Sequence, residues 1–197
     1  MELSPLAKER LAKIGSLSPE ENERLERAGE LESLLSRYFT GTISTEDLWG
    51  EIKELKKQRG GTITAEAQIK LLDAIRLQMS QEDFEQRRKA ILALETIKEK
   101  QKYASLEMNF NSIEALRNKL IKTKEQAFEQ LKSGMEAQLQ AAAQQAVRQG
   151  VNVDMDRSLE ANVKNSPQWK AFISKLEKDS EIMFNGYITK LRELMIV

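Results

Sequence analysis

The chain has 197 residues, of which 40% are apolar and 31% charged, and its 31 basic residues balance its 31 acidic residues. Zero net charge argues against a nucleic-acid-binding or polybasic membrane-surface protein, since both usually carry a basic excess. The chain has no cysteine and no histidine, which excludes disulfides, thiolate zinc sites and the most common general base. We expect a soluble, cytoplasmic protein without a signal peptide, because no apolar run approaches the roughly 20 residues that span a bilayer.

Three Ser-Pro pairs mark predicted helix starts, at Pro5, Pro19 and Pro167. Proline fits the first turn of a helix, and serine is a preferred N-cap. Between the last two prolines the chain is rich in Leu, Glu, Lys, Gln and Ala, which is typical of long helices. The sequence therefore predicts an all-α fold, with short capped helices followed by a long antiparallel coiled-coil helical hairpin.

Residues 1–59 are predicted to form a small N-terminal helical module. One helix runs from Ser4 to about Gly15, and a second runs from Ser18 to near Gly41. The turn at 41–46 resembles the segment at 61–66: in both, a glycine ends one helix and Ser44 or Thr64 caps the next. We therefore expect both segments to separate consecutive short helices.

Residues 31–55 resemble the SHOCT motif, a short helical hairpin usually found at bacterial C-termini. Its pattern has leucines, then Gly-x-Ile-[Thr/Ser]-x-Glu-[Glu/Asp]-[Phe/Leu], then a lysine-bearing helix. The matching residues are Leu31, Leu34, Leu35, Gly41, Ile43, Ser44, Glu46, Asp47, Leu48 and Lys53. In this chain the motif lies near the N-terminus instead. The resemblance implies an oligomerisation or interaction module without catalytic residues.

Residues 60–80 are predicted to form a hinge and a connecting helix. The pair Gly60-Gly61 follows a basic run and is the expected flexible joint. The pair lacks the lysine and Ser/Thr of a phosphate-binding loop. A new helix cap at Ser80 separates this segment from the long helical region that follows.

Residues 81–197 are predicted to form the hairpin. The apolar stripe of its first helix is interrupted at 98–102, where the helix either bends or continues straight through solvent. After a loop at 151–156, the final helix has seam positions at 169, 173, 176, 180, 183, 187, 191 and 194, which are apolar except for Ser180; their spacing near 3.5 indicates a coiled-coil seam. We expect this helix to return antiparallel along the preceding one, so that its large residues face Ala142 and Ala146.

The predicted interaction residues lie on these apolar stripes. The stretch from Phe84 to Phe110 is longer than the final helix can cover, so we expect the N-terminal helices, a second copy or another protein to shield it. A dimer is the expected form. The predicted seam or interface residues are Leu35, Phe39, Leu48, Trp49, Phe84, Ile91, Leu94, Phe110, Trp169, Ile173, Leu176, Met183, Tyr187 and Leu191.

No catalytic, cofactor-binding or metal-binding residues are predicted. The pair Asp154 and Asp156 lacks the spaced ligands and terminal glutamate of a calcium loop. The basic groups around Arg87 and Arg117 are interleaved with acidic residues, which is typical of a solvated helix.

The expected function is that of a non-enzymatic interaction or scaffold protein, binding itself or another protein, with no membrane partner and no small-molecule substrate. Two alternatives stay open. One is a chaperone or adaptor that clamps a client between helical arms. The other is a helical nucleic-acid-binding protein.

Overall fold

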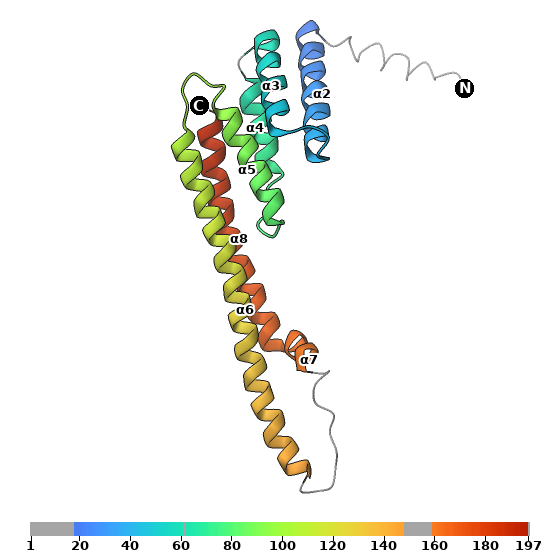
Figure 1. Cartoon of the computed structure of the whole chain (residues 1–197), viewed down its shortest axis with the longest axis vertical. Coiled ribbons are helices and arrows are strands. Elements are labelled where there is room, and N and C mark those ends of the chain that lie inside the picture. Colours follow the sequence, from blue (N-terminus) through green and yellow to red (C-terminus); the bar gives the residue numbers. More distant parts are fainter. Residues whose placement is uncertain (1–17, 61, 148–158, 197) are drawn as a thin grey trace, which may run out of the picture. The chain divides into compact units, whose positions relative to one another are not determined.

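The computed structural model describes residues 18–60, 62–147 and 159–196, with side chains of the longest helix described up to residue 141. Every regular element in these ranges is an α-helix, which confirms the predicted all-α class (Figure 1). The predicted helix at 4–15 and the loop at 151–156 lie outside the described residues. The helices are α2 (Pro19–Phe39), α3 (Thr45–Arg59), α4 (Ile63–Asp73), α5 (Gln81–Glu95), α6 (Tyr103–Val147), α7 (Leu159–Asn165) and α8 (Pro167–Ile196).

Serine N-caps begin α2 and α3, as the sequence predicts, and in the structure each is part of a capping box. The Ser18 backbone amide donates to the Glu21 carboxylate at 2.8 Å, and the Glu21 amide donates to Ser18 Oγ at 3.2 Å. Ser44 and Asp47 repeat this exchange at 3.0 and 3.1 Å. These hydrogen bonds satisfy amides that the first helical turn leaves unpaired, and they lower the pKa of both carboxyl groups.

The predicted cap at Thr64 is wrong. Helix α4 begins at Ile63, so Thr64 already lies inside it. Both side chains are buried: Ile63 is completely inaccessible, and only 1% of Thr64 is exposed. Burial of this first turn in the core therefore decides where α4 begins, and the local resemblance to the Ser44 turn does not.

The described residues belong to two compact units. The first unit comprises the described part of Met1–Asp73 together with Lys89–Glu99. In it, α2 packs against α3 and α4, and α3 packs against α4. Gly41 has a φ of +71° in the turn between α2 and α3, a conformation that side chains disfavour. The fully buried side chains of this unit include Leu31, Leu48, Ile52, Ile63, Leu71, Leu72, Ile91 and Leu94.

The second unit takes Ala74–Arg88 and Lys100–Val197. In it α8 returns antiparallel along α6, and α7 contacts both helices (Figure 1). The Phe84 and Phe110 rings meet edge to face with their centres 6.2 Å apart, and both side chains are completely buried. Of the three coverings that the sequence left open for this stretch, neither a second copy nor another protein is needed at these two rings, since residues of this chain bury both.

The predicted first helix of the hairpin is interrupted at the polar residues 98–102, where the sequence allowed either a bend or a straight helix. Helix α5 ends at Glu95, α6 begins at Tyr103, and turns and bends occupy 96–100. Residues 98–102 contain no apolar side chain that packing could hold in a helix. Of the two alternatives, the bent arrangement is the one observed.

The register of α8 differs from the predicted one. Trp169 packs against Phe128, with ring centres 5.3 Å apart, so α8 begins beside the middle of α6. The side chains of Ala142 and Ala146, which the prediction places opposite the large residues of this helix, lie outside the described ones. Further along, Phe184 is buried where the predicted seam has Met183, which is 51% exposed in the single chain.

Candidate functional site

The apolar stripe of α6 changes from buried to half-buried along its length. Its first half is at most 7% exposed, at Leu106, Phe110, Ile113, Leu116 and Leu120. The same spacing continues beyond Leu120, but the described side chains on this stripe are only half-buried there, at Ala127, Phe128, Leu131, Met135 and Leu139. We name residues 121–147, α7 and residues 167–177 of α8 the arm. Within the arm, this stripe keeps part of its apolar surface in contact with solvent.

Aromatic residues from both long helices meet in the arm. Trp169 contacts Phe128 edge to face, and the Trp169 and Phe172 rings stack with their centres 6.1 Å apart. The Lys164 ammonium lies 5.8 Å from the centre of the Phe128 ring. All three aromatic side chains are half-buried. Such a cluster is typical of surfaces that bind another protein, where aromatic residues contribute most of the contact energy.

Two ion pairs join α6 to the other helices of the arm. Lys124 of α6 donates to the Glu177 carboxylate of α8 at 2.7 Å, and the Gln78 amide donates to the same carboxylate at 3.2 Å. Lys132 lies 3.5 Å from Glu160 of α7. The hydrogen bond from Lys124 lowers the pKa of Glu177, against the opposing effect of burial. Charged groups thus connect α6 with α7 and α8, while the apolar side chains of the arm stay only half-buried.

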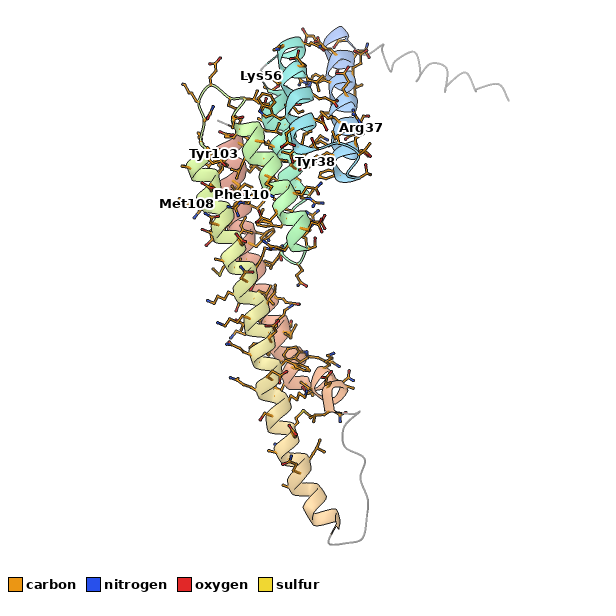
Figure 2. All side chains as sticks on the ribbon, viewed as in Figure 1. Arg37, Tyr38, Lys56, Tyr103, Met108 and Phe110 are labelled. Carbon is orange, nitrogen blue, oxygen red and sulfur yellow. The ribbon has the colours of Figure 1, made fainter. Side chains whose placement is uncertain are left out.

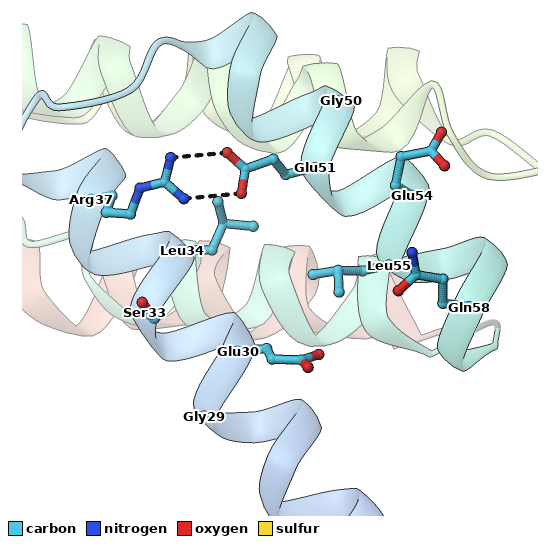
Figure 3. Close-up of a pocket in the computed structure, with 10 residues that line it drawn as sticks. All are labelled: Gly29, Glu30, Ser33, Leu34, Arg37, Gly50, Glu51, Glu54, Leu55 and Gln58. Atoms are coloured by element: carbon cyan, nitrogen blue, oxygen red, sulfur yellow. Dashed lines mark hydrogen bonds and ion pairs between the residues drawn. The ribbon is translucent and has the colours of Figure 1, made fainter.

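A groove lies between α2 and α3 in the first unit, with a volume of about 660 Å³ (Figure 3). Leu34 and Leu55 provide its apolar lining, and at one end Arg37 donates two hydrogen bonds of 3.1 Å to Glu51. Gly29 and Gly50 also line it, and a Cβ added to either would meet no atom within 4 Å. The groove is thus wide enough to admit side chains from a further element.

In the first unit, the predicted interaction residues separate into core and surface. Leu35, Leu48, Ile91 and Leu94 are buried. Phe39, 38% exposed, lines a hollow of about 530 Å³ between α2 and α4. Trp49 is half-buried, its indole nitrogen donates to Thr96 Oγ1 at 3.0 Å, and the Lys53 ammonium lies 4.5 Å from the centre of its ring.

In the second unit, Phe84, Phe110 and Leu191 belong to the core. Met108, two residues before Phe110, is 65% exposed, so one face of α6 is buried here and the opposite face is in contact with solvent (Figure 2). The remaining predicted residues are partly accessible: Trp169, Ile173, Leu176 and Tyr187 are half-buried, and Met183 is exposed. Of these, Trp169, Ile173 and Leu176 belong to the arm, where Trp169 contacts Phe128 and Phe172.

Sequence reasoning missed the role of Arg117, which it grouped with solvated basic residues. The Arg117 side chain is buried, and its two terminal nitrogens donate to the backbone carbonyls of Arg76, Leu77, Met79 and Ser80 at 2.7–3.2 Å. Burial lowers the pKa of Arg117, although Glu114 and Glu85 act in the opposite direction. A signal was present, because position 117 falls on the apolar stripe between Ile113 and Leu120.

Arg87 and Arg88, which were also considered for nucleic-acid binding, lie close to carboxylates of the same unit. Arg87 lies 3.1 Å from Asp83, and Arg88 lies 3.4 Å from Glu85 and 3.1 Å from Glu114. Within the described ranges, no group of three or more acidic residues is placed to hold a metal ion. None of the helices described here combines the length and the apolar content needed to cross a membrane.

No curated protein and no solved structure matches the chain. A sequence model of a family of unknown function, DUF6657, matches residues 49–195. The match begins inside α3 and ends near the end of α8, so it includes the arm and leaves out α2. Because it spans more than half of the chain, this protein belongs to the DUF6657 family.

Proposed function

We propose that this protein is a non-enzymatic interaction protein that self-associates through its arm. The observation that carries the proposal is the half-buried stripe of α6 from Ala127 to Leu139, together with the aromatic cluster of Phe128, Trp169 and Phe172. In this view the arm is an antiparallel coiled-coil hairpin that serves as an assembly surface in a scaffold.

The proposal follows from how helices bury apolar surface. Two packed helices cover the stripe where they touch, but the flanks of that stripe stay accessible until further helices cover them. In the first half of α6 the stripe is buried, whereas in the arm it is not. Two arms packed together would form a four-helix bundle and bury both flanks.

The charges favour a second copy of this chain as the partner that packs against the arm. The chain has zero net charge, so no long-range repulsion opposes the approach of two copies. Along the arm, Lys122, Glu125, Glu129, Lys132 and Glu136 mix both signs, which lets a two-fold arrangement place opposite charges together. We therefore expect a symmetric dimer.

The test is the mass in solution at micromolar concentrations, measured by sedimentation equilibrium. Met135 is half-buried in the arm and Met108 is exposed on the same helix outside it. We expect Met135→Glu to weaken dimerisation at least about tenfold, because association would bury the new charge, and we expect Met108→Glu to leave it unchanged. A wild-type chain that stays monomeric at tens of micromolar would contradict self-association. A different protein would then be the expected partner of the arm.

A further inference from the structure

The middle of α8 presents a solvent-exposed face that is separate from its buried one. At the centre of this face are two adjacent apolar side chains, Ile182 and Met183, which are 63% and 51% exposed. The buried side chains of the same stretch, Phe184 and Leu191, lie on a different side of the helix. Most of the exposed face lies beyond the arm, which includes α8 only as far as residue 177. The arm contact therefore does not account for it.

Four charged residues share this face, and their signs alternate along the helix from positive to negative. They are Lys175, Asp179, Lys190 and Glu193. Steps of four, three, eight and three connect them through Ile182, so all lie on one side of α8. Each of the four is exposed, and in the described part of the chain none of them forms an ion pair. The face thus has an apolar centre with two unpaired charges of opposite sign on either side.

We propose that this face of α8 binds the same face of a second copy, with the two helices antiparallel. Asp179 and Lys190 are eleven positions apart, and Lys175 and Glu193 are eighteen apart around almost the same midpoint, near residue 184. A two-fold axis at this level places Asp179 of each copy opposite Lys190 of the other, and Lys175 opposite Glu193. Parallel helices would instead bring equal charges together, which opposes association. The order of the charges therefore favours a second copy and sets its direction.

The apolar centre of the face fits the same arrangement. Ile182 and Met183 lie within about 4 Å of the level of the axis at 1.5 Å per residue, so both copies bring these side chains to the point where the helices meet. Each copy then covers apolar surface of the other, which favours association. The charged pairs lie about 8 and 14 Å to either side of the axis. An apolar centre with a polar rim is the usual composition of a protein interface.

This inference goes beyond the proposed function and does not rest on it, because it concerns a different stretch of α8. A chain that has both self-complementary surfaces can link dimers into larger assemblies. A contact between single helix faces buries little surface, so we expect it to need a higher protein concentration than the arm contact. The face is then free at the low concentrations used for thermal unfolding.

Charge reversal tests the proposal by sedimentation equilibrium, in the Met135→Glu background that weakens the arm contact. We expect Asp179→Lys to weaken association about tenfold, because the new lysine meets Lys190 of the other copy. Adding Lys190→Asp should restore association, because the two charges are then exchanged. The control Glu181→Lys makes the same change of charge at an exposed position on the other side of α8 and should have no effect.

Equal association of the Asp179→Lys and Glu181→Lys variants would overturn the proposal and assign the face to solvent. A Met135→Glu chain that stays monomeric at several hundred micromolar would also overturn it, while leaving the arm contact intact. All of these positions on α8 are exposed, and circular dichroism of each variant checks that the fold is retained.

Cross-linking tests the direction of the helices, since the chain has no native cysteine. Asp179→Cys chains are mixed with Lys190→Cys chains and treated with a short bifunctional maleimide. We expect linkage in the mixture to be roughly tenfold faster than in either variant alone, because the contact holds the two different positions together. In an antiparallel pair, equal positions are about 16 Å apart along the helix axis. Linkage of each variant to itself at the rate of the mixture would contradict the antiparallel pair.

Discussion

The guanidinium carbon of Arg117 lies 4.8 Å from the centre of the Phe84 ring, between α6 and the first residues of α5. The same guanidinium donates to carbonyls on both sides of the bend that joins α4 to α5. One cation thus fixes the loop at 74–80 and the start of α5 against α6. No carboxylate shares an ion pair with it among the described contacts, so carbonyl dipoles compensate its burial.

Replacing Arg117 by methionine should destabilise the protein by about 2–4 kcal/mol, because buried carbonyls lose their donors. Arg117→Lys should fall between methionine and wild type, since one ammonium cannot reach all four carbonyls. Urea unfolding measures the difference. Lys119→Met changes an exposed residue of the same helix and should stay within about 0.5 kcal/mol of wild type. Equal stability of the two methionine variants would show that the carbonyl contacts contribute nothing.

Removing the Gln68 amide should also destabilise the first unit. Gln68 Nε2 donates to the Ile91 carbonyl at 3.0 Å and to the Glu95 carboxylate at 2.9 Å, and both Gln68 and Glu95 are fully buried. We expect Gln68→Leu to cost about 1–3 kcal/mol in urea unfolding, since the carboxylate loses a donor. The double variant Gln68→Leu/Glu95→Met should cost less than the sum of the single changes. Strictly additive costs would show that the two side chains do not stabilise each other.

The pair of Lys124 and Glu177 should make stability depend on pH in the acidic range. The pKa of Glu177 is lowered from 4.5 by Lys124, so its contribution is complete above 4.5 and is lost as the pH falls through the lower folded value. We expect Lys124→Met to lower Tm at neutral pH, and we expect this difference to vanish at an acidic pH low enough to protonate Glu177 in the folded protein. In a Glu177→Gln background, Lys124→Met should have the same effect at both pH values. A difference in Tm that persists at acidic pH would assign the effect to packing of the lysine stem.

Two glycine substitutions should change stability in opposite directions. Gly186 is exposed within α8, where an added Cβ meets no atom within 4 Å, so Gly186→Ala should stabilise the protein by about 0.5–1 kcal/mol. Gly41 has a φ of +71°, so Gly41→Ala should destabilise it by about 1–2 kcal/mol. Thermal unfolding of both variants checks this. A destabilising Gly186→Ala would indicate that another chain packs closely against this position.

The helix starts follow from local chemistry, and the sequence predicted them well. The serine caps of α2 and α3 and the Ser166-Pro167 start of α8 depend on residues only a few positions apart. Thr64 shows where this reasoning ends, because contacts with distant residues bury it inside a helix. The break at 96–102 could be anticipated only as one of two alternatives, since a polar window permits both.

Burial between distant segments could not be predicted in the same way. Met183 and Phe184 are adjacent apolar residues, and only the packing of α8 against α6 decides which one is buried. A spacing of 3.5 selects Met183, but the buried positions Ser180, Phe184, Leu191 and Met195 are separated by steps of four and seven. Arg117 was assigned to solvent because acidic residues are interleaved with the basic ones around it, whereas the carbonyls that hold it lie some 40 positions earlier in the chain.

The transition at Leu120 along α6 has a consequence for how the molecule opens. Between Leu106 and Leu120 the apolar face of α6 is buried in a filled core, so we expect exchange of its amide hydrogens with solvent to require large-scale unfolding. Those of residues 124–141 flank half-covered side chains, and small local fluctuations suffice to release them. A single continuous helix thus has a protected end and a labile end, and within the described part of α6 the labile end costs less to reshape.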